Sequence, residues 1–125
     1  MKLKQILDPK FQEALRNLSA QPLPLTAAFK LKSIKAIIYQ EYDKYKQCHQ
    51  EALIRLADKD AAGQPLMESD GCTVKMSTAN KDLLLKELSK LMEIDVVINR
   101  ISVEEFGGIM ISVDNLESLD PIFIT

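Results

Sequence analysis

The stretch TAAFKLKSIKAIIYQEYDKYKQCHQEALIRLA, Thr26 to Ala57, decides the fold because it predicts one long helix, capped by Thr26. Its apolar side chains recur in steps of three and four residues, close to the helical period of about 3.6. A strict repeat of about 3.5 would place Glu41 and Arg55 on the seam, so a straight helix is favoured over a coiled coil. The apolar stripe comprises Leu31, Ile34, Ile38, Tyr42, Tyr45, His49, Ala52 and Leu56.

The residues before this helix predict a shorter one. Asp8 can accept a hydrogen bond as an N-cap, and Pro9 suits a first helical turn. Two prolines in SAQPLPL, residues 19–25, end this helix. Met1 to Leu7 is expected to form a short edge strand. The face of the short helix consists of Phe11, Ala14, Leu15 and Leu18.

The stretch DKDAAGQPLMESDG, Asp58 to Gly71, predicts the end of the long helix followed by a turn. Gly63 can take a left-handed conformation, and Pro65 prevents the helix from resuming. Asp-Gly between two apolar-rich arms predicts a small hairpin over residues 64–76. A calcium loop is not expected, because Ala62 and Ser69 stand where two oxygen ligands of an EF-hand belong.

A leucine-rich helix, Ala79 to Met92 with Ser77 or Thr78 as its cap, should pack antiparallel against the long helix. Ile38 and Leu88 both belong to the core of this pairing. The alternating run at residues 94–99 predicts a strand that pairs with the hairpin or with another chain.

The last quarter of the chain predicts several short elements. Ser102 and Glu105 have capping-box spacing, which indicates one helical turn closed by two glycines. IMI, residues 109–111, is expected to be a strand, and Ser112 should cap a helix that ends before Pro121. The predicted fold is therefore α+β and predominantly helical: one domain, residues 1–125, with a long helix antiparallel to a shorter one, a small β-hairpin or sheet and a short C-terminal helix.

Composition indicates an ordinary globular protein. The chain has 125 residues and a net charge of −2, and no apolar run approaches the roughly 20 residues of a membrane helix. The charge is unevenly distributed: residues 1–50 hold nine Lys and Arg against four Asp and Glu, whereas residues 51–125 hold seven against fourteen. The halves could attract each other within one fold, subunits could dock head to tail, or the basic half could touch an acidic partner.

Catalytic and metal sites are not expected. Cys48 and Cys72 are read as two buried thiols, and with His49 as the only histidine they cannot form a zinc site or a cysteine–histidine pair. Asp58, Asp60, Glu104 and Glu105 lie in predicted turns, where solvation leaves carboxylates ordinary. No cofactor and no enzymatic activity are predicted.

The long helix carries a candidate partner-binding basic face. Lysines with an interleaved tyrosine, Tyr39, can contact phosphates and stack a base, so nucleic acid stays a weaker alternative. Acidic residues on the same helix and the acidic net charge argue against it. The face consists of Lys30, Lys32, Lys35, Lys44 and Lys46.

The order of elements resembles a family of small uncharacterised proteins encoded by tailed bacteriophages and prophages. The resemblance rests on PLPLTAAFKLKSIKAIIYQEYDKYKQCHQEALIRLADKDAAGQP at residues 22–65, EIDVVINRISVEEF at residues 93–106 and ISVDNLESLDPIFI at residues 111–124. It implies a phage or prophage origin and carries no catalytic residue over to this chain.

The resemblance and the long helix together predict a non-enzymatic protein that acts through protein–protein contacts. We expect a virion structural or assembly-associated component, found in the host cytoplasm or the virion; the alternative is an effector that binds and inhibits a host or defence protein. The partner would be a second copy, another phage structural protein or a host protein, with no membrane. The apolar tail, Ile122, Phe123 and Ile124, is a further candidate contact.

Overall fold

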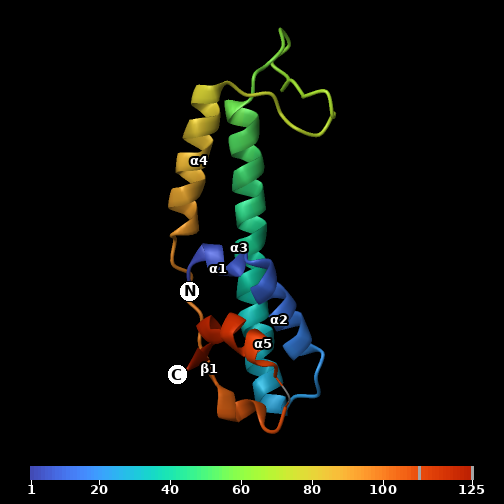
Figure 1. Cartoon of the computed structure of the whole chain (residues 1–125), viewed down its shortest axis with the longest axis vertical. Helices are drawn as coiled ribbons and strands as arrows, with labels where there is room; N and C mark the ends of the chain where they lie inside the picture. Colours follow the sequence, from blue (N-terminus) through green and yellow to red (C-terminus); the bar gives the residue numbers. More distant parts are fainter. Residues whose placement is uncertain (110, 125) are drawn as a thin grey trace. The chain divides into compact units, whose positions relative to one another are not determined.

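The computed structural model describes residues 1–109 and 111–124, and its longest element is helix α3, Leu25–Leu56 (Figure 1). The predicted long helix is confirmed. It begins one residue earlier than the expected cap, because the Ala28 amide already donates to the Pro24 carbonyl at 2.9 Å. Thr26 therefore lies inside the first turn, and its predicted role as the N-cap is wrong.

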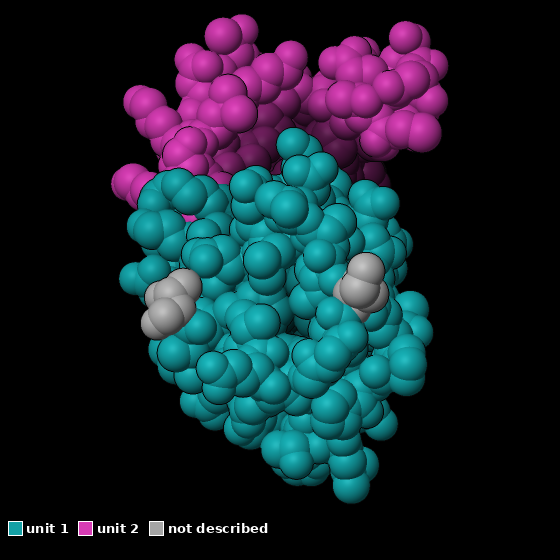
Figure 2. Space-filling view, turned by 60° about the horizontal axis from the view of Figure 1, so that its bottom comes forward, with its two compact units in different colours: residues 1–42, 93–125 teal, residues 43–92 magenta. Residues whose placement is uncertain are grey.

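The chain forms two compact units, which are coloured separately in Figure 2. Unit 1 comprises residues 1–42 and 93–125, and unit 2 comprises residues 43–92. The single domain stays a prediction: the chain divides into two compact units, but one helix, α3, belongs to both of them.

Unit 1 begins with a single helical turn, α1, Leu3–Ile6, so the edge strand predicted for residues 1–7 is wrong. Leu3 and Ile6 are both buried and lie three residues apart, which is the spacing of one helix face. Helix α2, Pro9–Ser19, follows as predicted, with the Asp8 carboxylate accepting the Lys10 amide at 2.9 Å.

The expected strand at residues 94–99 is reduced to one antiparallel bridge, between Asp95 and Lys2. Its partner within the chain is the N-terminus and not the hairpin: the Leu3 amide donates to Ile94 O at 2.9 Å, and the Val96 amide to Met1 O at 2.7 Å. Val96 is buried, whereas Val97 is 86% exposed. Of the alternating residues 94–99, Val96 alone has a buried side chain.

The C-terminal segment of unit 1 consists of β1, Ile101–Ser102; the 3₁₀ turn η1, Val103–Phe106; α5, Val113–Ser118; the 3₁₀ turn η2, Asp120–Ile122; and β2, Phe123–Ile124. Strands β1 and β2 pair in parallel, with Ile101 opposite Phe123. The predicted caps are confirmed, because Glu105 accepts the Ser102 amide at 3.1 Å and Ser112 accepts the Asn115 amide at 3.1 Å. The predicted strand at 109–111 includes Met110, which lies outside the described residues.

Unit 1 holds the hydrophobic core. Phe106 and Phe123 meet edge to face, with ring centroids 5.5 Å apart. The buried side chains come from α1, α2, the first half of α3, the stretch between α4 and β1, and the C-terminal segment. They are Leu3, Ile6, Phe11, Ala14, Leu15, Leu18, Ala27, Leu31, Ile34, Ile38, Val96, Ile101, Phe106, Leu119, Ile122 and Phe123.

Unit 2 is a helical pair joined by a long turn. The second half of α3 packs against α4, Thr78–Met92, which runs antiparallel to it (Figure 1). The predicted fold class is thus confirmed. The predicted hairpin at residues 64–76 is present in short form: Met67 and Val74 form an antiparallel bridge, and the Lys75 amide donates to the Leu66 carbonyl at 2.8 Å. In its turn the Asp70 carboxylate accepts the Cys72 and Thr73 amides, each at 2.8 Å. Gly63 and Gly71 have φ of +80° and +72°, as left-handed turns require.

Candidate functional site

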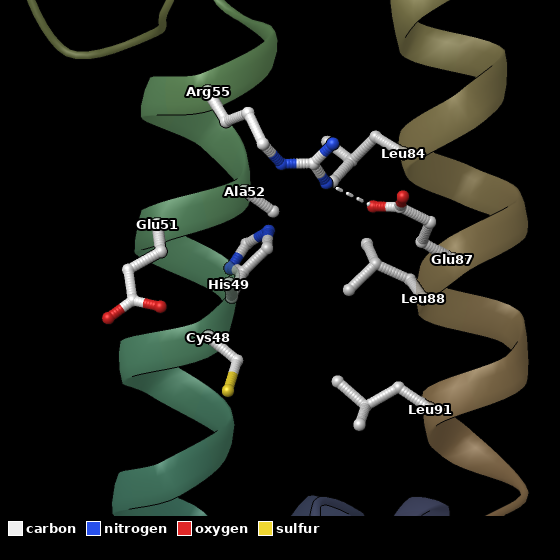
Figure 3. Close-up of a pocket in the computed structure, with 9 residues that line it drawn as sticks. All are labelled: Cys48, His49, Glu51, Ala52, Arg55, Leu84, Glu87, Leu88 and Leu91. Carbon is white, nitrogen blue, oxygen red and sulfur yellow. Dashed lines mark hydrogen bonds and ion pairs between the residues drawn. The ribbon is translucent and has the colours of Figure 1, made fainter.

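The candidate site is a groove in unit 2 between the second half of α3 and α4, with a volume of about 360 Å³ (Figure 3). We call it the arm groove. Helical spacing builds it, because residues 48, 52 and 55 of α3 and residues 84, 88 and 91 of α4 both follow steps of four and three. It is lined by Cys48, His49, Glu51, Ala52, Arg55, Leu84, Glu87, Leu88 and Leu91.

Polar contacts join the two helices near the turn. Arg55 Nη2 donates to Glu87 Oε2 at 2.7 Å, and Asn80 Nδ2 donates to the Leu56 carbonyl at 3.0 Å. The Arg55–Glu87 pair is exposed on both sides, with 57% and 42% of the side-chain surfaces accessible, so it contributes about 0–1 kcal/mol. The Asn80 contact satisfies a carbonyl that the end of α3 leaves without a helical partner.

The apolar side chains that face the arm groove are incompletely covered. Leu84, Leu88 and Leu91 are only half-buried, and no side chain of α4 is fully buried. In residues 43–92, all of which the structure describes, the buried hydrophobic side chains are Leu56 and Ala57 alone. The helix pair therefore keeps apolar surface that could bind apolar side chains of a partner.

The two thiols are exposed, so the prediction that they are buried is wrong. Cys48 lies at the open arm groove, and Cys72 lies in the turn beside Gly71. His49 stacks on Tyr45, with ring centroids 5.7 Å apart and planes 12° from parallel. Among the residues that the structure describes, no hydrogen bond joins Cys48 to His49.

The five lysines of the predicted basic face do not share one side of α3. Residues two apart on a helix point about 160° apart, so Lys30 opposes Lys32, and Lys44 opposes Lys46. Lys30 pairs with Glu105, which lowers the pKa of that carboxyl, and Lys35 is half-buried. Lys44 and Lys46 are exposed and interact with other residues.

The predicted contact tail is mostly part of the core. Ile122 and Phe123 are 0% and 2% exposed, and β2 pairs with β1 of the same unit. Ile124, 56% exposed, is the part of the tail that a partner can reach.

The carboxylates of the predicted turns are used locally. Asp60 Oδ1 accepts the Ala62 and Gln64 amides at 2.9 and 3.0 Å, and Glu105 accepts the Ser102 amide. Within residues 1–109 and 111–124, no three His, Cys, Asp or Glu side chains gather as a metal site would require. Asp58 and Glu104 are exposed.

Two features of unit 1 escape sequence reasoning. Glu93 accepts from Lys2 Nζ at 2.6 Å and from Lys4 Nζ at 2.9 Å, across more than 85 residues of chain, and no local pattern predicts this cluster. A second groove of about 320 Å³, lined in part by Leu15, Arg16 and Tyr39, opens between α2 and α3. The signal available in the sequence was Tyr39, an aromatic residue outside the apolar stripe of the long helix.

Comparison with models of protein families, with curated proteins and with solved structures finds no match to this chain. Within the described part of the chain, no helix is long and apolar enough to cross a membrane.

Proposed function

We propose that this protein is a non-enzymatic phage or prophage component that acts through protein–protein contacts, as a virion structural or assembly-associated protein. The observation that carries the proposal is the arm groove, whose leucines remain half-buried in a unit with only two buried hydrophobic side chains. Apolar surface left open in a folded protein is typical of a contact site.

The spacing of the arm groove favours a helical partner. Its leucines repeat at i, i+4 and i+7 along one face of α4, and a hydrophobic groove of this kind can take the apolar face of an amphipathic partner helix. Leu83 and Leu85, 41% and 63% exposed, extend the apolar surface of α4 beyond the arm groove. The Arg55–Glu87 pair gives one wall of the arm groove a charged rim, as protein interfaces commonly have.

The phage part of the proposal rests on the sequence resemblance alone. The groove supports binding to another protein, and the resemblance supplies the setting in which small proteins of this kind bind repeatedly to one another or to a larger particle.

The test is quantitative mass spectrometry of gradient-purified particles from the phage or prophage that encodes the chain. A stoichiometric copy number is the expected result. Absence from particles, with the protein abundant in the lysate and bound one to one to a host protein, would overturn the virion assignment in favour of the inhibitor.

A matched pair of variants ties the result to the arm groove. Ala52→Arg places a long charged side chain in the groove and should reduce incorporation into particles, whereas Gln50→Arg introduces the same side chain at an exposed position outside it. Equal incorporation of both folded variants would exclude the arm groove as the contact.

A further inference from the structure

The side of α3 that faces away from the core carries a second pattern. Leu25, Phe29 and Tyr39 are 87%, 72% and 55% exposed, although large apolar side chains normally avoid water. Three further exposed residues, Lys32, Ala36 and Asp43, lie on the same side of α3. The six residues follow one another in steps of four, three, four, three and four, which is the repeat of a coiled-coil seam. We call this the outer stripe: Leu25, Phe29, Lys32, Ala36, Tyr39 and Asp43.

The central part of the outer stripe, residues 32–43, is self-complementary. Lys32 and Asp43 lie equally far, in opposite directions, from the midpoint between Ile37 and Ile38. Ala36 and Tyr39 are likewise equally far from that midpoint. A two-fold axis through the midpoint would therefore exchange each member of a pair for the other, as the symmetry of a homodimer requires.

We propose that the outer stripe pairs with the outer stripe of a second copy of this chain, with the two α3 helices antiparallel. Lys32 of each copy then faces Asp43 of the other, and the large Tyr39 faces the small Ala36. The same axis places Phe29 opposite Lys46 and Leu25 opposite Gln50 of the other copy, so these two apolar side chains would pack on the carbon chains of polar residues. This proposal goes beyond the contacts of the arm groove, because it concerns another surface and names the partner.

Charge selects the antiparallel arrangement over the parallel one. A parallel pair would place Lys32 against Lys32 and Asp43 against Asp43, and like charges in contact disfavour association. Among the residues that the structure describes, neither Lys32 nor Asp43 has a side-chain hydrogen bond or ion pair, so both remain available to a second copy.

The test is sedimentation velocity of the full chain over a range of concentrations. The wild type should pass from monomer to dimer as its concentration rises. Lys32→Asp and Asp43→Lys should each raise the dissociation constant of the dimer roughly tenfold or more. In either variant, residues 32 and 43 carry the same charge, so both equivalent contacts between the copies become repulsive. An equimolar mixture of the two variants should recover the dimer, because the Lys32→Asp copy presents two aspartates to the two lysines of the Asp43→Lys copy.

The controls make each outcome decisive. Lys10→Asp reverses an exposed charge on α2 and should leave the dimer unchanged, while circular dichroism confirms that every variant is folded. A wild type that stays monomeric, or a dimer insensitive to both reversals, would overturn the proposal. A dimer that is insensitive to both charge reversals would use another surface. That result, like a wild-type monomer that still enters particles, would leave the proposed binding function standing.

Discussion

At the scale of single residues, Glu93 joins the two stretches of chain that form unit 1, residues 1–42 and 93–125. The ammonium groups of Lys2 and Lys4 hydrogen-bond to it and hold its pKa at about 2, well below the usual 4.5. The same contact raises the pKa of Lys2. The N-terminal residues are thereby anchored where the chain returns from α4.

This pKa predicts how stability depends on pH. Because the folded state lowers the pKa of Glu93, its contribution is present above about pH 4.5 and is lost as the pH falls toward about 2. Glu93→Gln should lower the melting temperature near pH 7 and have little effect near pH 2, measured by thermal unfolding over that range. Glu104→Gln, at an exposed carboxylate, is the control. An equal loss from Glu93→Gln at both ends of the range would contradict the ion-pair explanation.

At the scale of helices and strands, local signals predicted most caps, in which both partners of a contact lie within one turn, and Thr26 is the exception. The caps by Asp8, Ser112 and Glu105 follow from spacing alone, and the structure confirms all three. Pairings between distant segments could not be predicted, because nothing in residues 94–96 specifies the N-terminus as their partner. For the same reason the apolar tail was read as a free contact, when β2 in fact pairs with β1.

Burial also distinguishes two helix positions that sequence periodicity treats alike. Ile38 is 2% exposed, whereas Leu88 is half-buried at the arm groove. Ile38→Asp should therefore cost roughly 3 kcal/mol or more and unfold unit 1, because it buries an unpaired charge. Leu88→Asp, whose carboxylate can reach water, should cost about 1–2 kcal/mol. Urea unfolding measures both costs, and equal costs would show that α4 is more buried than the structure indicates.

At the scale of the whole molecule, the two units differ in how they are stabilised. Unit 1 has a continuous apolar core, and unit 2 depends on partly covered leucines, the Arg55–Glu87 pair and the Asn80 contact. The arm groove could not be predicted as an open site, because periodicity gives the face of a helix and not how completely that face is covered. The lysines were grouped wrongly for a different reason: once the segment is taken as a helix, spacing alone places neighbours two apart, such as Lys30 and Lys32, on opposite sides, and the grouping overlooked this.

The difference in burial predicts a difference in local stability. Amide hydrogens of α4 should exchange with solvent faster than those of α2, because opening unit 2 exposes less apolar surface. Hydrogen exchange followed by mass spectrometry measures both helices in one sample. Equal protection would mean that the chain opens only as a whole, and slower exchange in α4 on adding purified particles would locate a contact there.

The exposure of Cys48 and Cys72 has a practical consequence for handling the protein. Because each chain offers two accessible thiols, air oxidation can link one copy to two others, and repeated linkage gives an open ladder of covalent species on a non-reducing gel rather than a single band of pairs. Such a ladder would disappear on adding a reductant, whereas a complex held by packing and charge would persist. In preparations kept without reductant, the disulfide-linked species would therefore grow with storage time into aggregates that are unrelated to the protein's biological assembly.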